Sequence, residues 1–396
     1  MADADSAGLN AHALARLTAK FTDRIAHGRM PGAVLLIERH GVLACFESLG
    51  QQDPGHGLAM HADSIFRIYS MTKPIVSVAL MMLVERGLVS LRDPVAKFLP
   101  EFAAVRVGVE RDGRLELVAP RRAMTVHDLL RHTAGLTYEF LEPSAVRQRY
   151  VQAGLYARDR SNAEHSALLA GLPLMHEPGS VWDYSRATDV LGRVVEVIAG
   201  RPLGEQLRRE IFEPLGMVDT GFAVPTAEHA RIAEPFATDP DSGAPIKLFD
   251  ARLRAALESG GGGLFSTAAD YARFLRLLLN GGTTGGAKGG TSGGVRLLGR
   301  KTLESMTADH LGALPRSGDV LPRGHGFGLG FAVKTDVGMH TEPGSVGSYG
   351  WSGAAGTAFF VDPQEALFAI LMVQAPGQLD ELRELFRQMI YAAIDD

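Results

Sequence analysis

Residues 70–87 read SMTKPIVSVALMMLVERG. The chain after Lys73 is strongly apolar as far as Glu85, and Gly87 follows, which predicts a buried helix that ends at a glycine. Proline is tolerated only in the first turn of a helix, where its missing N–H breaks no hydrogen bond. Pro74 therefore places Ser70 at the N-terminus of this helix.

Ser70 and Lys73 form the S-x-x-K sequence of this stretch, with side chains on one helix face and Cβ atoms about 5–6 Å apart. The helix dipole favours an anion at Ser70. A lysine at the edge of an apolar core loses hydration, which lowers its pKa and lets the neutral amine accept a proton. Taken alone, the motif fits a serine N-cap followed by a surface lysine better than a nucleophile and its base.

Both ends of the chain predict strands and helices. Residues 33–38 and 42–46 read as two strands after a helix whose apolar stripe ends at Ile25, and residues 357–361 and 366–373 read as two more before a terminal helix. From about residue 71 to residue 215 the apolar spacing is mostly helical. We expect an α/β (α+β) fold: one sheet built from both chain ends and flanked by helices, plus an inserted, mostly helical domain. The expected domains are 1–70 with 258–396, and 71–257, with the active site between them.

The composition excludes several classes of function. The chain of 396 residues is 46% apolar and 21% charged, with a net charge of −5 and no Lys/Arg block, so neither nucleic acid nor anionic lipid is an expected partner. No apolar run approaches the roughly 18 residues of a membrane span, and the N-terminus lacks the features of a signal peptide. We therefore expect a cytoplasmic protein. The single cysteine, Cys45, reads as a buried structural thiol.

Other motifs in the chain are interpreted as non-functional. The glycine-rich stretch Gly281–Gly294 predicts a flexible surface loop, and its G-x-S-x-G around Ser292 lacks the strand and helix that a nucleophile elbow requires. His127 and His132 have a poor spacing for metal ligands on one helix face, and both read as structural. No cofactor motif and no metal site are predicted.

Four further stretches accompany the S-x-x-K: DLLRHTAGL (128–136), PGSVWDYS (178–185), IFEPLGM (211–217) and GGLFSTAAD (262–270). Together they resemble, in order, landmarks of the class C β-lactamases and penicillin-binding proteins. The resemblance implies a β-lactamase-like fold with an antiparallel sheet. It implies Ser70 as nucleophile and Lys73 and Tyr184 as the groups that move its proton, with Lys73 lowering the pKa of Tyr184.

The third motif of that family, Lys-Thr-Gly, is replaced here by Gly350-Trp351-Ser352-Gly353-Ala354. This sequence is most similar to the W-G-G version of the family VIII carboxylesterases. The resemblance implies an oxyanion hole made by the amides of Ser70 and Ala354, and close backbone approach to the substrate at Gly353.

Two departures from the β-lactamase pattern bear on the substrate. Trp351 stands in place of the lysine that helps bind a drug's carboxylate, and Arg186 in place of an asparagine. We expect Tyr69, Trp182 and Trp351 to form an aromatic wall that suits a neutral ester.

The predicted activity is hydrolysis of short-chain carboxylic esters, small-molecule substrates, through an acyl-Ser70 intermediate. β-Lactam hydrolysis, acyl transfer and cleavage of small amides or D-peptides stay open as alternatives at the same site. A sensor that is acylated without turnover is the alternative from another class. The oligomeric state is left open.

Overall fold

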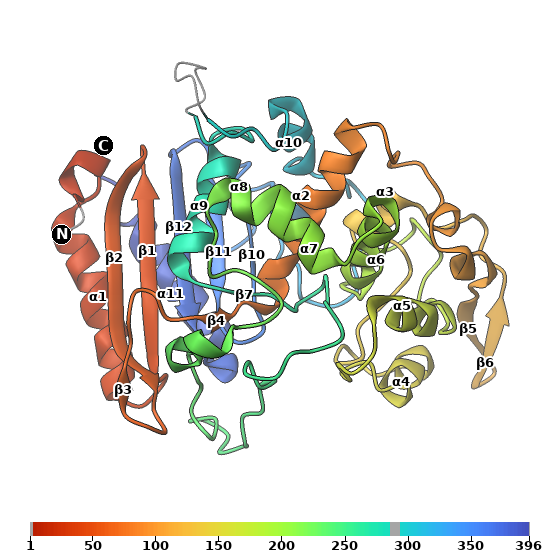
Figure 1. The fold of residues 1–396 in the computed structure, drawn as a ribbon, viewed down its shortest axis with the longest axis horizontal. Helices are drawn as coiled ribbons and strands as arrows, with labels where there is room; N and C mark the ends of the chain where they lie inside the picture. The colour runs from red at the N-terminus through yellow and green to blue at the C-terminus, as the bar shows by residue number, and fades with distance from the viewer. Residues whose placement is uncertain (1–2, 286–293, 396) are drawn as a thin grey trace.

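The computed structural model describes residues 3–285 and 294–395 and contains one large antiparallel sheet (Figure 1). Its eight strands lie in the order β3-β2-β1-β12-β11-β10-β9-β8, so both chain ends contribute to it, as predicted. The strands are β1 (Gly32–Arg39), β2 (Val42–Asp53), β3 (Leu58–Ala59), β8 (His325–Phe327), β9 (Ala332–Lys334), β10 (Tyr349–Ser352), β11 (Ala358–Asp362) and β12 (Leu367–Val373). Two short pairs complete the strands: β4 (Phe66–Arg67) with β7 (Phe265–Ser266), and β5 (Val107–Arg111) with β6 (Arg114–Val118).

Helices cover both faces of the sheet, which explains why the central strands are continuously apolar. Alternate residues of a strand point to opposite faces. In β1, Val34 and Leu36 join the core beneath α2 (Thr72–Glu85) and α9 (Ala268–Leu279), whereas Leu35 and Ile37 join the core beneath α1 (Ala11–Ala26) and α11 (Leu379–Tyr391). Figure 1 shows α9 in front of the strands.

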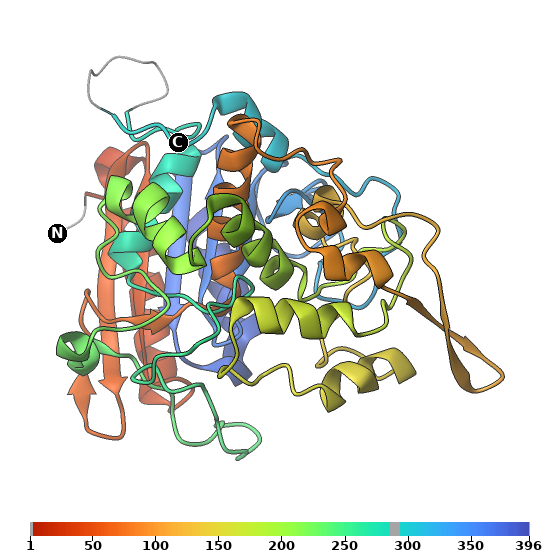
Figure 2. The ribbon, with the colours of Figure 1, turned by 45° about the vertical axis from the view of Figure 1, so that its right-hand side comes forward.

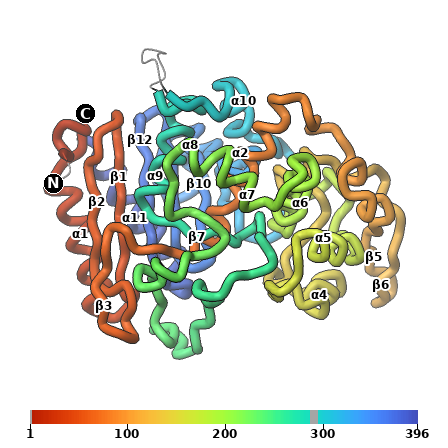
Figure 3. The backbone as a smooth tube through the Cα atoms, in the orientation of Figure 1, coloured from red at the N-terminus to blue at the C-terminus, as the bar shows by residue number. Residues whose placement is uncertain are grey.

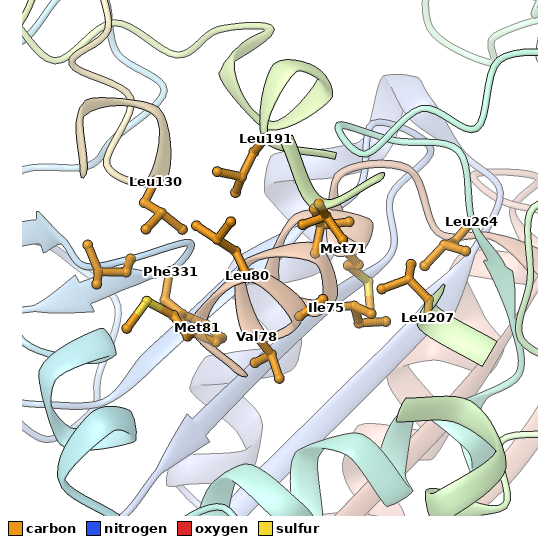
Figure 4. Close-up of a cluster of buried hydrophobic side chains, with 14 of the residues drawn as sticks. Met71, Ile75, Val78, Leu80, Met81, Leu130, Leu191, Leu207, Leu264 and Phe331 are labelled. Carbon is orange, nitrogen blue, oxygen red and sulfur yellow. The ribbon is translucent and has the colours of Figure 1, made fainter. Parts of the chain in front are cut away.

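Helix α2 lies at the centre of the larger core (Figure 4). Its residues Thr72 to Leu83 are all buried, so this helix is apolar on every side and not amphipathic. Met71 and Ile75 lie near Leu207 and Leu264, and Leu80 lies near Leu130 and Leu191 (Figure 4). The buried helix predicted from residues 70–87 is confirmed, with Pro74 in its first turn.

The chain between β4 and β7 is mostly helical in its first part. After α2, the α-helices are α3 (Val126–Leu130), α4 (Ala145–Gln152), α5 (Asn162–Ala170), α6 (Ala187–Ala199), α7 (Leu203–Leu207) and α8 (Glu213–Leu215). The β5–β6 hairpin, which the apolar spacing does not predict, extends away from this region (Figure 2). Residues 219–257 form irregular loops with one 3-10 helix, Thr226–Arg231. The division into domains 1–70 with 258–396 and 71–257 stays a prediction.

The two chain ends lie side by side (Figure 3), where Leu9 bridges Ile394 and the amide of Asn10 donates to the carbonyl of Ala393 at 2.7 Å. The remaining helix, α10 (Arg300–Met306), follows the glycine-rich stretch. Ser292 lies outside the described residues. Cys45 is buried, as predicted, and burial raises the pKa of its thiol to about 12. Across the described ranges, no helix is both long and apolar enough to cross a bilayer.

Candidate active site

Ser70 lies in a 3-10 turn, Tyr69–Met71, that runs directly into α2. Tyr69 has φ +42°, a left-handed conformation that costs free energy for a residue with a side chain. Its ring packs edge-on against Phe249 with centroids 4.9 Å apart, and the amide of Ile68 donates to the carbonyl of Leu264 at 3.1 Å. These contacts hold the strained turn and fix Ser70 in the cleft.

Three predicted residues meet at one oxygen atom. Lys73 Nζ lies 3.0 Å from Ser70 Oγ, and the hydroxyl of Tyr184 lies 2.6 Å from it. Both are hydrogen-bond distances at which a proton can pass between nucleophile and base. The structure therefore brings together Ser70, Lys73 and Tyr184, although Tyr184 is 114 residues from Ser70 in sequence.

Lys73 is fully buried and makes two more hydrogen bonds, to the hydroxyl of Tyr138 at 3.0 Å and to the carbonyl of Gly261 at 2.6 Å. Burial lowers the pKa of Lys73 from 10.5 to about 7, Asp189 opposes this shift, and Arg186 adds to it. A substantial fraction of Lys73 is therefore neutral at pH 7 and can accept a proton.

Tyr184 differs from the prediction in its electrostatics. Burial raises the pKa of its hydroxyl, and the hydrogen bonds with Ser70 and Trp351 only partly offset this effect. Lys73 Nζ lies over the Tyr184 ring, 4.6 Å from its centroid, and is itself partly neutral. In the resting site the pKa of Tyr184 is therefore raised and not lowered as expected, because burial outweighs the hydrogen bonds.

Trp351 lies on β10 and donates its indole N–H to the Tyr184 hydroxyl at 3.2 Å. The residue that replaces the usual lysine thus contacts the tyrosine of the site. Trp351 also packs against Tyr184, with ring centroids 5.2 Å apart.

Gly353 follows β10 and lies against the chain that leads to Ser70. A Cβ atom there would be 2.5 Å from the carbonyl oxygen of Ile68 and 2.3 Å from Thr357 Oγ1. The close approach expected at Gly353 therefore involves the protein backbone at Ile68, two residues before Ser70. Within residues 3–285 and 294–395, no group accepts a hydrogen bond from the amides of Ser70 and Ala354. Ser352 accepts a hydrogen bond from Arg383 of α11.

These residues open into a cleft of about 1710 Å³. Tyr69, Trp351, Ser352, Gly353 and Ala354 line it, as do further aromatic residues: Tyr138, Phe140, Tyr156, Tyr184 and Phe249.

The expectation that Trp182 lines the pocket is wrong. Trp182 is completely buried in a cluster behind the site, where its ring lies 6.4 Å from that of Tyr184 and 5.6 Å from that of Phe327. Trp182 and Tyr184 are two positions apart in an extended segment, but sequence alone does not say which side of that segment faces solvent.

Arg186 has a structural role. It pairs with Glu139 and lies 3.5 Å from Asp189. Asp189 accepts the amide of Gly261 at 2.9 Å, and the Gly261 carbonyl holds Lys73. Sequence reasoning missed Tyr138, Asp189 and Gly261. Asp189 follows Arg186 by one helical turn, a spacing typical of an ion pair, whereas Tyr138 and Gly261 give no local signal because tertiary folding brings them to Lys73.

The described residues contain no cluster of side chains that could bind a metal ion, since no group of three His, Cys, Asp or Glu side chains is placed to hold one. His127 pairs with His310 at 3.0 Å and His132 with Ser185 at 3.0 Å, consistent with their structural interpretation.

The chain belongs to the Beta-lactamase family, whose model matches residues 17–394. It is 35% identical to the Mycobacterium tuberculosis protein Rv1367c, over 88% of this chain and 86% of that one. It is 33% identical to esterase EstB of Burkholderia gladioli, over 96% and 95% of the two chains. Among solved structures it is similar to EstCE1, a hydrolase with promiscuous acyltransferase activity, with a TM-score of 0.80, 27% identity and coverage of 98% and 99%.

Proposed function

We propose that the protein is a carboxylesterase that hydrolyses small-molecule esters through an acyl-Ser70 intermediate. The observation that carries the proposal is the position of Ser70 Oγ, within hydrogen-bond distance of both Lys73 Nζ and the Tyr184 hydroxyl. Membership of the family and similarity to EstB and EstCE1 support a serine hydrolase that acts on esters.

The two proton-carrying groups take different parts in acylation. Neutral Lys73 accepts the proton of Ser70 as the oxygen attacks the ester carbonyl. Tyr184 keeps its proton in the resting site because its pKa is raised, and it donates that proton to the departing alkoxide. The step leaves an acyl-Ser70, a Lys73 ammonium and a Tyr184 phenolate, with the alcohol released.

Deacylation reverses these proton positions. The Tyr184 phenolate accepts a proton from water as the water oxygen attacks the acyl carbonyl, and the Lys73 ammonium returns a proton to Ser70 Oγ when the acid leaves. The N–H of Trp351 stabilises the phenolate between these steps. The cycle restores neutral Lys73, protonated Tyr184 and the Ser70 hydroxyl.

The amides of Ser70 and Ala354 are proposed to bind the oxyanion of both tetrahedral intermediates. Neither has a partner among the described residues, and both residues line the cleft. A donor in such a position contributes about 2.7–4 kcal/mol to transition-state stabilisation. The aromatic walls around them favour a short neutral acyl group at the reacting carbon.

The test is Ser70→Ala, assayed with a short-chain p-nitrophenyl ester. We expect kcat/KM to fall by about 10⁴-fold or more, because the nucleophile is lost, with the unfolding transition preserved. Ser352→Ala is the matched control, since it removes a hydroxyl from the same cleft without touching Ser70. Hydrolysis that survives Ser70→Ala would disprove the assignment.

Acyl transfer is a second candidate, favoured by the size of the cleft and by similarity to EstCE1. An alcohol that occupies the cleft in place of water would attack the same acyl-Ser70. Product analysis with added alcohols decides this question: a new ester in place of free acid indicates transfer.

A further inference from the structure

Arg158 is a half-buried cationic side chain of the cleft that has no anionic partner among the described residues. Arg158 lines the cleft together with Tyr69 and Ser70, and its guanidinium carbon lies 3.9 Å from the centroid of the Phe249 ring. Its Nη2 atom is buried and makes no hydrogen bond to any described residue. A buried donor left without an acceptor is costly, so a position of this kind needs a reason.

The other buried or half-buried arginines of the cleft are neutralised by carboxylates. Arg147 pairs with Asp183 at 2.9 Å, Arg186 pairs with Glu139, Arg383 pairs with Asp380, and Arg387 lies 3.8 Å from Glu342.

No ion pair is present for Arg158 anywhere in 3–285 or 294–395. Burial lowers its pKa, Tyr69 opposes this shift and Arg67 adds to it, and neither of these neighbours is a carboxylate. Lys247 and Arg323 also line the cleft without an ion pair among the described residues, but both are exposed and water can solvate them. Arg158 is therefore the half-buried positive charge that the protein itself leaves uncompensated.

The position of Arg158 is fixed from two sides. Its carbonyl accepts the amides of Ala256 and Leu257, at 2.9 and 3.2 Å. The Phe249 ring beneath its guanidinium is held by Arg67, which donates to the Phe249 carbonyl at 2.7 Å. Phe265 and Tyr69, the residue directly before Ser70, also pack edge-on against that ring. A prearranged donor in the cleft that contains the nucleophile can select substrates without first being ordered.

We propose that Arg158 binds a carboxylate of the substrate, so that the natural ester carries a negative charge remote from its scissile bond. The inference rests on the proposed esterase function and defines its substrate class. A guanidinium suits this task because its N–H groups match the two oxygens of a carboxylate. The aromatic surroundings of Ser70 then contact the uncharged part of the ester, and Arg158 contacts its charged end.

The test compares two pairs of matched esters. One pair places the charge on the acyl side: the p-nitrophenyl half-ester of glutarate against p-nitrophenyl valerate. The other pair places the charge on the alcohol side: the butyrate ester of 4-hydroxybenzoate is compared with the butyrate ester of methyl 4-hydroxybenzoate. We expect wild type to favour the charged member of one pair, and Arg158→Met to lower that ratio of kcat/KM about 10- to 100-fold.

Arg252→Met is the matched control. Arg252 lies in the same irregular region, residues 219–257, as Phe249, and it pairs with Glu234. It does not line the cleft. Its loss should leave both ratios unchanged, which separates a direct contact from a general change in charge.

Two further measurements keep the proposal testable if Arg158→Met does not fold. Arg158→Lys keeps the charge but loses the forked geometry, so it should retain part of the preference. In wild type, raising the ionic strength should lower the charged-to-neutral ratio, because salt screens the attraction.

The inference is wrong if wild type shows no preference in either pair, or if Arg158→Met leaves the preference intact. That result would not affect the esterase assignment as long as wild type hydrolyses the neutral esters and Ser70→Ala does not. Loss of the esterase assignment itself would appear as no Ser70-dependent hydrolysis of any of the four esters.

Discussion

Lys73 shows how burial alone prepares a residue for chemistry. Its ammonium group would lose most of its hydration on α2, so the neutral form becomes accessible near pH 7. The hydrogen bonds to Tyr138 and Gly261 fix the nitrogen beside Ser70. The same residue type on the surface would stay charged and unreactive.

The pH dependence of hydrolysis follows from this pKa. Since Lys73 is the proposed base, kcat/KM should rise as the pH increases through about 7 and then level off. A pH–rate profile with a neutral ester measures this limb without titration of the substrate. Asp189→Asn should move the limb to lower pH, because Asp189 raises the pKa of Lys73. A profile that is flat from about pH 6 to about pH 8 would exclude Lys73 as the base.

Trp351→Phe tests the hydrogen bond to Tyr184. Phenylalanine keeps an aromatic ring in the cleft but cannot donate to the Tyr184 hydroxyl. We expect kcat to fall about 2- to 10-fold, the range for one hydrogen bond of this kind, with the melting temperature nearly unchanged. An unaltered kcat would show that the indole N–H does not stabilise the phenolate.

At the scale of elements, the turn after β10 determines where Ala354, the proposed second oxyanion donor, lies. Trp351 and Ser352 are paired with β11, and Gly353 then passes against the carbonyl of Ile68. The sheet thus positions Ala354, while α2 positions Ser70. The site depends on the contact between these two elements.

Gly353→Ala should disrupt that contact. The added methyl group overlaps the carbonyl oxygen of Ile68, which is backbone and cannot move aside alone. We expect a stability loss of about 1–3 kcal/mol and a loss of kcat up to about 10²-fold as the Ala354 amide shifts. Urea denaturation and steady-state kinetics measure the two effects. Ser352→Ala, one residue away, should leave both nearly unchanged.

Several elements could be predicted because their signals are local. The apolar stripe of α1, the two neighbouring strands β1 and β2, and the apolar strands β11 and β12 can all be predicted from the sequence, and the structure confirms them. The β5–β6 hairpin was missed because each strand has only five residues, in which charged and apolar residues are mixed, and almost all of them are partly or fully exposed.

At the scale of the whole molecule, one core crosses the expected domain boundary. The same cluster contains Phe368 and Ile370 of the sheet, Ile75 of α2, and Val190 and Leu191 of α6. Helix α2 has no polar face, so both the sheet and α6 are needed to bury its surface.

The shared core predicts a single cooperative unfolding transition. Parts of a chain that bury one core together cannot unfold independently without exposing it. Urea transitions followed by far-UV circular dichroism and by tryptophan fluorescence should coincide. Two separated transitions would instead support domains that fold on their own.

The sequence by itself determined the family, the strands at both chain ends and the nucleophile helix, because apolar periodicity and short motifs are local properties of the chain. The cytoplasmic location stays a prediction. Only the tertiary structure decided that Trp182 lies behind the site, that burial raises the pKa of Tyr184, and that Tyr138 and Gly261 hold Lys73. Nothing in the sequence indicates that Arg158 has no carboxylate partner among the described residues. Burial, pKa and charge compensation depend on neighbours that are distant in the chain, and folding alone brings these neighbours together.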